Sequence, residues 1–161
     1  METVEKYFSF LIHEYNFSVT EEMSYPNNPI AQGKIIYLSR LRQEGTGRRQ
    51  VIVRVLIDRG YLSVDIGSSD LDSKDYFDLH EIMRVIAPDT DMDFSLDFSK
   101  HPKDIIEPQA KKLSELVMIH CESFLNGDFS IGDTIINARM EERERRLQRW
   151  KEERRQKDLL S

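Results

Sequence analysis

The sequence predicts an α+β fold: an N-terminal helix, a four-stranded antiparallel meander, helices packed on one sheet face, and an extended, charged C-terminal helix. Three observations support this prediction. Segments rich in Val, Ile, Leu and Tyr, joined by short turns, fill the first part of the chain. After Gly67 the spacing of apolar residues changes from that of a strand to that of a helix. From about residue 133 onward, charged residues dominate.

The N-terminal segment predicts a short amphipathic helix over residues 3–15. Its apolar residues recur at helical spacing; they are Val4, Tyr7, Phe8, Leu11 and Tyr15. Phe17 and Val19 then alternate with polar residues, which predicts a first strand before the turn-forming segment Tyr-Pro-Asn-Asn-Pro at 25–29.

Three further strands are expected, over residues 34–40, 49–58 and 61–66. In the second of these, one face is formed entirely by β-branched residues, so that face is expected to be buried; it consists of Val51, Val53, Val55 and Ile57. The turns at 45–47 and 58–60 are too short for a crossover helix, so neighbouring strands must run antiparallel.

Two helices are expected after the strands. The first starts near Ser73 or Asp75 and ends before Pro88. Its apolar stripe consists of Leu79, Ile82, Met83 and Ile86. The second covers residues 110–124, carries one apolar stripe, and is ended by an Asn-Gly pair.

The chain is expected to divide into an α+β globular domain, residues 1–132, and a charged, partly projecting C-terminal helix, residues 133–161. Charge is distributed unevenly between the two parts. Residues 134–161 carry nine Lys/Arg and six Asp/Glu, which leaves a net charge of about −9 on residues 1–133. An acidic body repels phosphate and favours a partner with a basic surface.

The composition indicates a cytoplasmic protein. No apolar run approaches the roughly 20 residues that cross a bilayer, and the first residues lack the pattern of a signal peptide, so we expect no membrane association. Cys121 is the only cysteine, which excludes a disulfide within the chain.

Two segments begin like metal-binding motifs but lack decisive residues. Residues 89–93 alternate carboxylates as a calcium loop does, yet Phe94 stands where a Gly is needed and Lys100 where a Glu closes the loop. Residues 80–84 begin like a helical zinc-protease motif, but Arg84 replaces the second His. We therefore expect no metal site and no cofactor.

The sequence shows no recognisable catalytic arrangement, so we expect a protein that is not an enzyme. His120 and Cys121 are adjacent, and adjacent helical residues point about 100° apart, so they form no nucleophile–base pair. A buried, inert thiol is expected instead. Gly45 and Gly47 offer two glycines of a dinucleotide motif, but the segment leads into a strand. A hydrolase whose residues meet only in the fold, in a deep polar pocket with His80 or His120, is an alternative.

The C-terminal helix is expected to stand partly in water or to mediate self-association. Glutamates four residues before Arg or Lys support an exposed helix; the pairs are Glu141 with Arg145, Glu142 with Arg146, and Glu153 with Lys157. The same glutamates reduce the field of the arginines, and Trp150 is the only aromatic residue there, so nucleic acid is a disfavoured partner.

Three segments in this order are similar to a loose group of small uncharacterised bacterial α+β proteins that are described as immunity-like. They are Tyr-Phe-Ser-Phe-Leu-Ile-His-Glu-Tyr-Asn-Phe at 7–17, the strand pair 51–66 with Asp-Arg-Gly at its turn, and Gly-Asp-Phe-Ser at 127–130 before a charged helix. The resemblance implies a shape, and a role in binding and neutralising a partner toxin; it transfers no functional residue.

We therefore expect a non-catalytic protein-binding module that binds a basic partner through two acidic loops, 70–78 and 89–97. The candidate contact residues are Asp70, Asp72, Asp75, Asp78, Asp89, Asp91 and Asp93. The alternative is a small regulatory or nucleic-acid-associated protein that uses the basic C-terminal helix.

Overall fold

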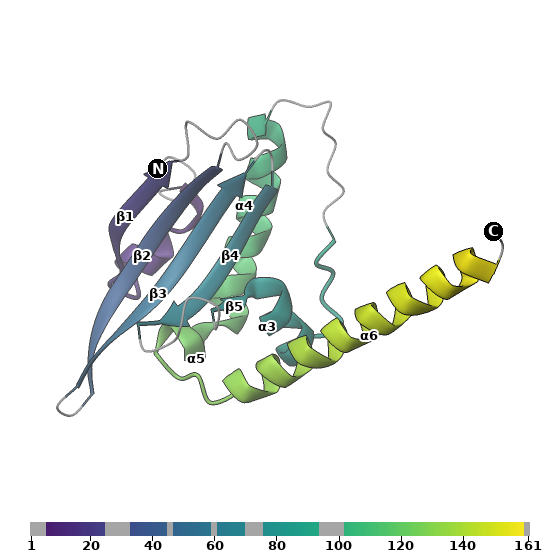
Figure 1. The fold of residues 1–161 in the computed structure, drawn as a ribbon. Helices are drawn as coiled ribbons and strands as arrows, with labels where there is room; N and C mark the ends of the chain where they lie inside the picture. Colours follow the sequence, from purple (N-terminus) through teal and green to yellow (C-terminus); the bar gives the residue numbers. More distant parts are fainter. Residues whose placement is uncertain are drawn as a thin grey trace. The chain divides into compact units, whose positions relative to one another are not determined.

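The structure is a computed structural model of the 161-residue chain, and it describes residues 6–24, 33–44, 47–58, 61–69, 76–93 and 102–159. The chain forms two compact units, residues 1–129 and 130–161. The first unit contains an antiparallel sheet and several helices, and the second contains one long helix (Figure 1). The predicted α+β class is confirmed.

The sheet has five antiparallel strands in sequence order. They are β1 Ser18–Ser24, β2 Gly33–Glu44, β3 Gly47–Asp58, β4 Tyr61–Ser68 and β5 Phe77–Asp78. The predicted meander is confirmed for β1 to β4, whose strands are longer than expected, and β5 is an addition. The predicted turn at 25–29 and the tips at 45–46 and 59–60 lie outside the described residues.

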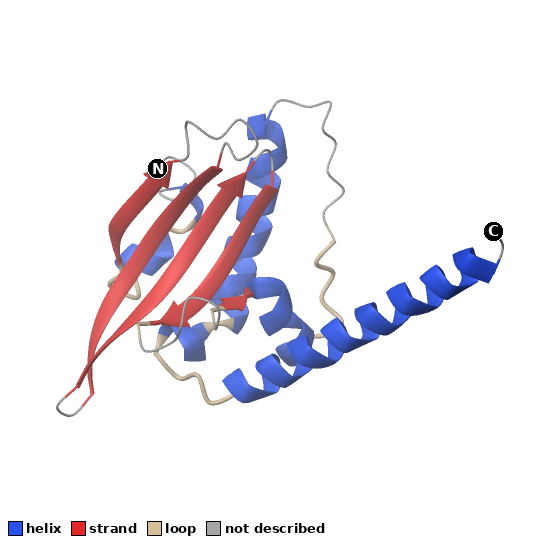
Figure 2. Ribbon diagram, in the orientation of Figure 1, coloured by secondary structure: helices blue, strands red, loops and turns tan. Residues whose placement is uncertain are grey.

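One sheet face is largely buried and the other is partly exposed, as the alternation in β3 indicated, although Ile57, which was expected on the buried face, is only half-buried. Val51, Val53 and Val55 are at most 1% exposed. Their cross-strand neighbours in β4, Val64 and Ile66, are equally buried. Helices α2 and α4 lie on the same side of this sheet (Figure 2).

The predicted N-terminal helix is present over residues 6–13, with a break at Phe8. Residues 6–7 are helical, α2 covers Ser9–His13, and residues 1–5 lie outside the described residues. Asn16 has a φ of 56°, a left-handed conformation that Asn tolerates better than most residues. The chain therefore leaves the helical path before Phe17, which is buried at the start of β1.

The helix expected from Ser73 or Asp75 starts later, so that prediction was wrong for residues 77–78. Residues 77–78 form β5, which pairs with β4, and α3 covers Leu79–Ile86. Residues 73–75 lie outside the described residues. The start is fixed by a capping box, in which the Asp78 side chain accepts from the helix backbone and Glu81 accepts from the Asp78 amide.

The helix expected over 110–124 is longer at its start and is divided near its end. Helix α4 covers Pro102–His120 and contains Pro108, and α5 covers Glu122–Leu125 after a break at Cys121. Pro108 disfavoured helix in the sequence, because an interior proline removes a backbone donor. Pro102 indicates where the helix starts, since proline is favoured in the first helical turn.

An aromatic cluster joins β5, α5 and the end of the first unit. Ring centroids lie 6.0 Å apart for Phe77 and Phe124, 6.2 Å for Phe77 and Phe129, and 5.4 Å for Phe124 and Phe129. Spacings in this range are favourable for edge-to-face and tilted aromatic pairs. Gly127, with a φ of 81°, turns the chain between the last two rings.

The second unit contains α6, Gly132–Leu159. Two of the predicted ion pairs are present, Glu141 with Arg145 at 3.7 Å and Glu142 with Arg146 at 3.0 Å. The first pair is exposed on both sides and the second on its arginine side, so each contributes little to stability.

Candidate functional site

The predicted contact residues are distributed over two segments. Asp70, Asp72 and Asp75 lie outside the described residues, as does the part of the second loop after residue 93. Asp89, Asp91 and Asp93 are exposed on the loop that follows α3, residues 87–93, which we call the acidic loop.

Asp78 has a structural role that the sequence analysis did not assign. Its Oδ1 accepts from the His80 backbone amide at 2.8 Å and lies 3.1 Å from His80 Nδ1. The signal was present in the sequence, since Asp at the cap and Glu81 three residues later form a capping-box pattern. Because Asp78 is engaged at the helix start, it is a weaker contact candidate than the exposed aspartates.

His80 connects the helix start to the acidic loop. The hydrogen bond to Asp78 raises the pKa of His80, and a backbone hydrogen bond to Met92 raises it further, whereas burial opposes both. His80 lies beside Asp78, and its side chain is 29% exposed. The imidazole therefore fixes Met92, and with it the end of the acidic loop, to α3.

Three other contacts shape the acidic loop. The Thr90 amide donates to the Ala87 carbonyl at 3.0 Å, and the Asp93 amide donates to Asp91 Oδ1 at 2.9 Å. Asp91 Oδ2 also lies 3.5 Å from Lys112 Nζ on α4. The hydrogen bond from the Asp93 amide, followed by the Lys112 charge, lowers the pKa of Asp91. Asp91 thus holds the loop, while the carboxylates of Asp89 and Asp93 have no ion-pair partner among the described residues.

A pocket of about 150 Å³ lies beside the acidic loop. Its lining residues are His80, Met83, Arg84, Ala87, Pro88, Thr90 and Met92. Small-molecule sites usually measure roughly 300–1,000 Å³, so this pocket is smaller than most of them. Its walls are mostly apolar.

A second polar cluster lies on the partly exposed face of β3 and β4. Arg54 Nη2 donates to Asp65 Oδ2 at 2.9 Å, and the Arg54 guanidinium lies 4.0 Å from the Tyr76 ring centroid. Burial raises the pKa of Asp65, and the charges of Asp78 and Glu81 raise it too, against the opposing effect of Arg54. Arg54 Nε is buried without a hydrogen-bond partner. Arg54 is thus held by a carboxylate and a ring, an arrangement that fixes this face of the sheet.

The two remaining sequence candidates for chemistry lie at the end of α4. His120 is partly exposed, and Cys121 is fully buried, where burial raises the pKa of the thiol to about 12. Within the described ranges, no three His, Cys, Asp or Glu side chains come together in a way that could hold a metal ion. None of the helices in those ranges is sufficiently long and apolar to span a membrane.

Comparisons with protein-family models, with curated proteins and with solved structures find no match to this chain.

Proposed function

We propose that residues 1–129 form a non-catalytic protein-binding module that binds the basic surface of another protein through the acidic loop. The observation that carries this proposal is the exposed pair of carboxylates, Asp89 and Asp93, on a loop whose backbone is held by four contacts. A loop that is already ordered loses less conformational entropy when it binds.

The pocket beside the loop supplies the apolar part of this surface. Protein interfaces combine a central side chain in a pocket with a polar rim, and the central contacts provide most of the affinity. Here Met83, Pro88 and Met92 line the pocket, and Asp89 and Asp93 flank it in sequence. An apolar side chain of the partner would enter the pocket while its basic neighbours meet the carboxylates.

The resemblance to immunity-like proteins favours a toxin as the partner, and the acidic charge of residues 1–133 favours association with a basic protein. Neither observation identifies the partner. A cytoplasmic location belongs to the same proposal.

Affinity capture from a lysate of the source organism, quantified by mass spectrometry, tests this function. Asp89→Asn/Asp93→Asn removes the two charges and leaves Asp91 to shape the loop, whereas Ala87→Leu fills the pocket and changes no charge. The matched control is Glu115→Gln/Glu122→Gln, which removes two exposed charges from α4 and α5. We expect a basic protein to bind the wild type and the control, and to be lost from both loop variants. Equal capture by all four baits would contradict the proposal.

A further inference from the structure

Five of the basic side chains of α6 lie on one face of the helix, although acidic and basic residues are mixed along its sequence. At 100° per residue, steps of three and four return to the same face. The residues at these steps are Arg139, Arg143, Arg146, Trp150, Arg154 and Lys157, which we call the basic stripe. Glu141, Glu144 and Glu152 fall on other faces, whereas Glu142 and Glu153 border the stripe. The helix thus separates charges that the sequence mixes.

The basic stripe is accessible. The Arg146 side chain is 69% exposed and Trp150 is 53% exposed, and Arg143, Arg154 and Lys157 are also exposed. The Arg154 guanidinium lies 5.1 Å from the Trp150 ring centroid, within cation–π distance. The stripe therefore presents cations on both sides of one aromatic ring.

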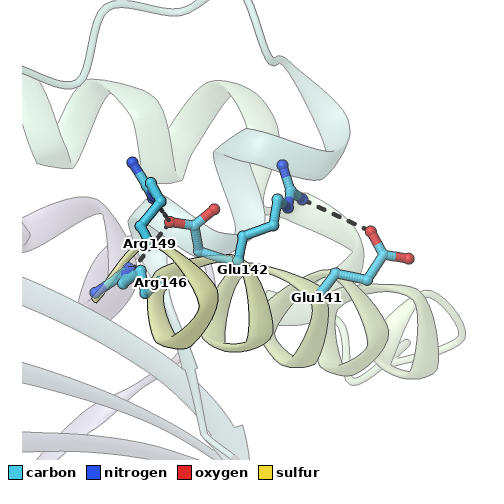
Figure 3. Close-up of polar contacts among 5 residues, drawn as sticks. Glu141, Glu142, Arg146 and Arg149 are labelled. Atoms are coloured by element: carbon cyan, nitrogen blue, oxygen red, sulfur yellow. Dashed lines mark hydrogen bonds and ion pairs between the residues drawn. The ribbon is translucent and has the colours of Figure 1, made fainter. Parts of the chain in front are cut away.

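Two acidic residues, Glu142 and Glu153, border the stripe, and Glu142 is already paired. Glu142 Oε1 accepts from Arg146 Nε at 3.0 Å and from Arg149 Nη2 at 3.5 Å, as Figure 3 shows. These contacts, with the Arg146 hydrogen bond first, lower the pKa of Glu142. Arg149 lies outside the stripe, but Arg146 belongs to it, so one stripe cation is shared with Glu142.

A second copy of α6 does not suit this face. Met140, Leu147 and Trp150 are exposed and follow coiled-coil spacing, which would favour pairing of two helices. The same spacing places Arg143 and Arg154 at the interface between the two helices. Two such helices would bring like charges together, so the occupant of the stripe must be anionic.

A membrane surface also fits poorly. Helices that lie on membranes need an apolar face along their length. Residues 151–158 contain no apolar residue. Four of the five cations are arginines, whose planar guanidinium binds phosphate oxygens through two hydrogen bonds.

We infer that the basic stripe of α6 binds the phosphate backbone of a nucleic acid. The 18 steps from Arg139 to Lys157 span about 27 Å at ~1.5 Å per residue. A duplex carries roughly 16 phosphate charges over that length, enough to engage all five cations. Trp150 supplies a surface for stacking on an unpaired base. This inference is independent of the acidic loop, which lies in the other unit.

Fluorescence anisotropy of the full chain, with a labelled DNA duplex of about 20 base pairs and a labelled single-stranded RNA, tests this site. The stripe offers at most five phosphate contacts on duplex DNA, so log K should fall with log salt at a slope no steeper than about −4.5. Arg143→Gln/Arg154→Gln should weaken binding at least about tenfold and reduce that slope by about two.

The matched control is Arg145→Gln/Arg155→Gln, which removes the same charge from other faces of α6. It should change affinity by less than about twofold, and circular dichroism should show equal helix content in all three proteins. Equal loss in both variants would overturn the inference, because net charge would then explain binding. Failure of the wild type to bind either probe, or binding to phosphatidylserine vesicles or an acidic protein instead, would also overturn it.

Discussion

Gln109 and Leu62 are joined by a buried hydrogen bond that ties α4 to the edge of the sheet. The Leu62 amide donates to Gln109 Oε1 at 3.1 Å, and Gln109 Nε2 donates to the Ile105 carbonyl at 3.0 Å. Among the described residues, strand β4 pairs with β5 through Asp65 and Ile66, and there the amide of Leu62 has no partner strand on that side. The Gln109 side chain, 2% exposed, takes the place of a neighbouring strand.

Replacement of Gln109 by Leu should leave the Leu62 amide buried without an acceptor. We expect a loss of about 1–3 kcal/mol in the free energy of unfolding, measured by urea denaturation. Lys111→Leu, at an exposed position of the same helix, should change stability by less than about 0.5 kcal/mol. Equal stabilities of the two variants would show that the hydrogen bond does not hold this edge.

The contact between Gly67 and Tyr76 can be tested by a double-mutant cycle. A Cβ at Gly67 would clash with Tyr76 Cδ1, so the ring must move away. Gly67→Ala should therefore cost about 1–3 kcal/mol, and displacement of the ring would also weaken its contact with Arg54. In a Tyr76→Ala background the same substitution should cost less than about 0.5 kcal/mol. An additive cycle would contradict the close packing.

The pKa of His80 should depend on the charge of Asp78. Asn caps helices as well as Asp does, so Asp78→Asn should keep the cap but lower the pKa of His80, which NMR titration measures. A raised His pKa gives stability that is fully present below pH ~6.5 and is lost as the pH rises through the folded value.

The stability difference between wild type and Asp78→Asn should therefore be largest in acid and shrink as pH increases past the raised pKa of His80. Asp78→Ala also removes the cap and should cost a further ~0.5–2 kcal/mol at every pH. An unchanged His80 titration in Asp78→Asn would show that the Asp78 carboxylate does not bind the imidazole.

Cys121 should be inert in the folded protein. Its side chain is fully buried, and burial raises the pKa of the thiol to about 12, so almost no thiolate is present at neutral pH. Labelling with a thiol reagent, followed by mass spectrometry, should proceed only at the rate of unfolding and become rapid in urea. Fast labelling of the native chain would contradict the burial of this residue.

The sequence predicted the elements whose signal is local. Alternation in β3 and the apolar spacing in α3 identify their elements, because each reports directly which face is buried. Elements that depend on distant partners were missed or misplaced. Strand β5 exists because Phe77 pairs with Ile66 across the sheet, and the two residues are ten or more positions apart. The start of α4 was missed because the prediction followed the apolar stripe, which was identified only from residue 110 onward.

The candidate surfaces also depend on residues that only the fold brings together. The exposed carboxylates Asp89 and Asp93 follow from composition, but the pocket beside them needs Met83 and Met92 to meet in space. Likewise, the sequence of α6 predicts exposed ion pairs. The basic stripe was missed because acidic and basic residues are mixed along the sequence. Only the helical arrangement places Arg143, Trp150 and Arg154 on one face.

Association kinetics with the captured partner test the central claim most directly, namely that Asp89 and Asp93 attract a basic protein surface. Stopped-flow association should become slower as ionic strength rises for the wild type, because steering between opposite charges is screened by salt. Asp89→Asn/Asp93→Asn should associate more slowly at low salt and respond less to it, with Glu115→Gln/Glu122→Gln close to the wild type. Identical rates and salt dependence for the wild type and the loop variant would contradict the claim.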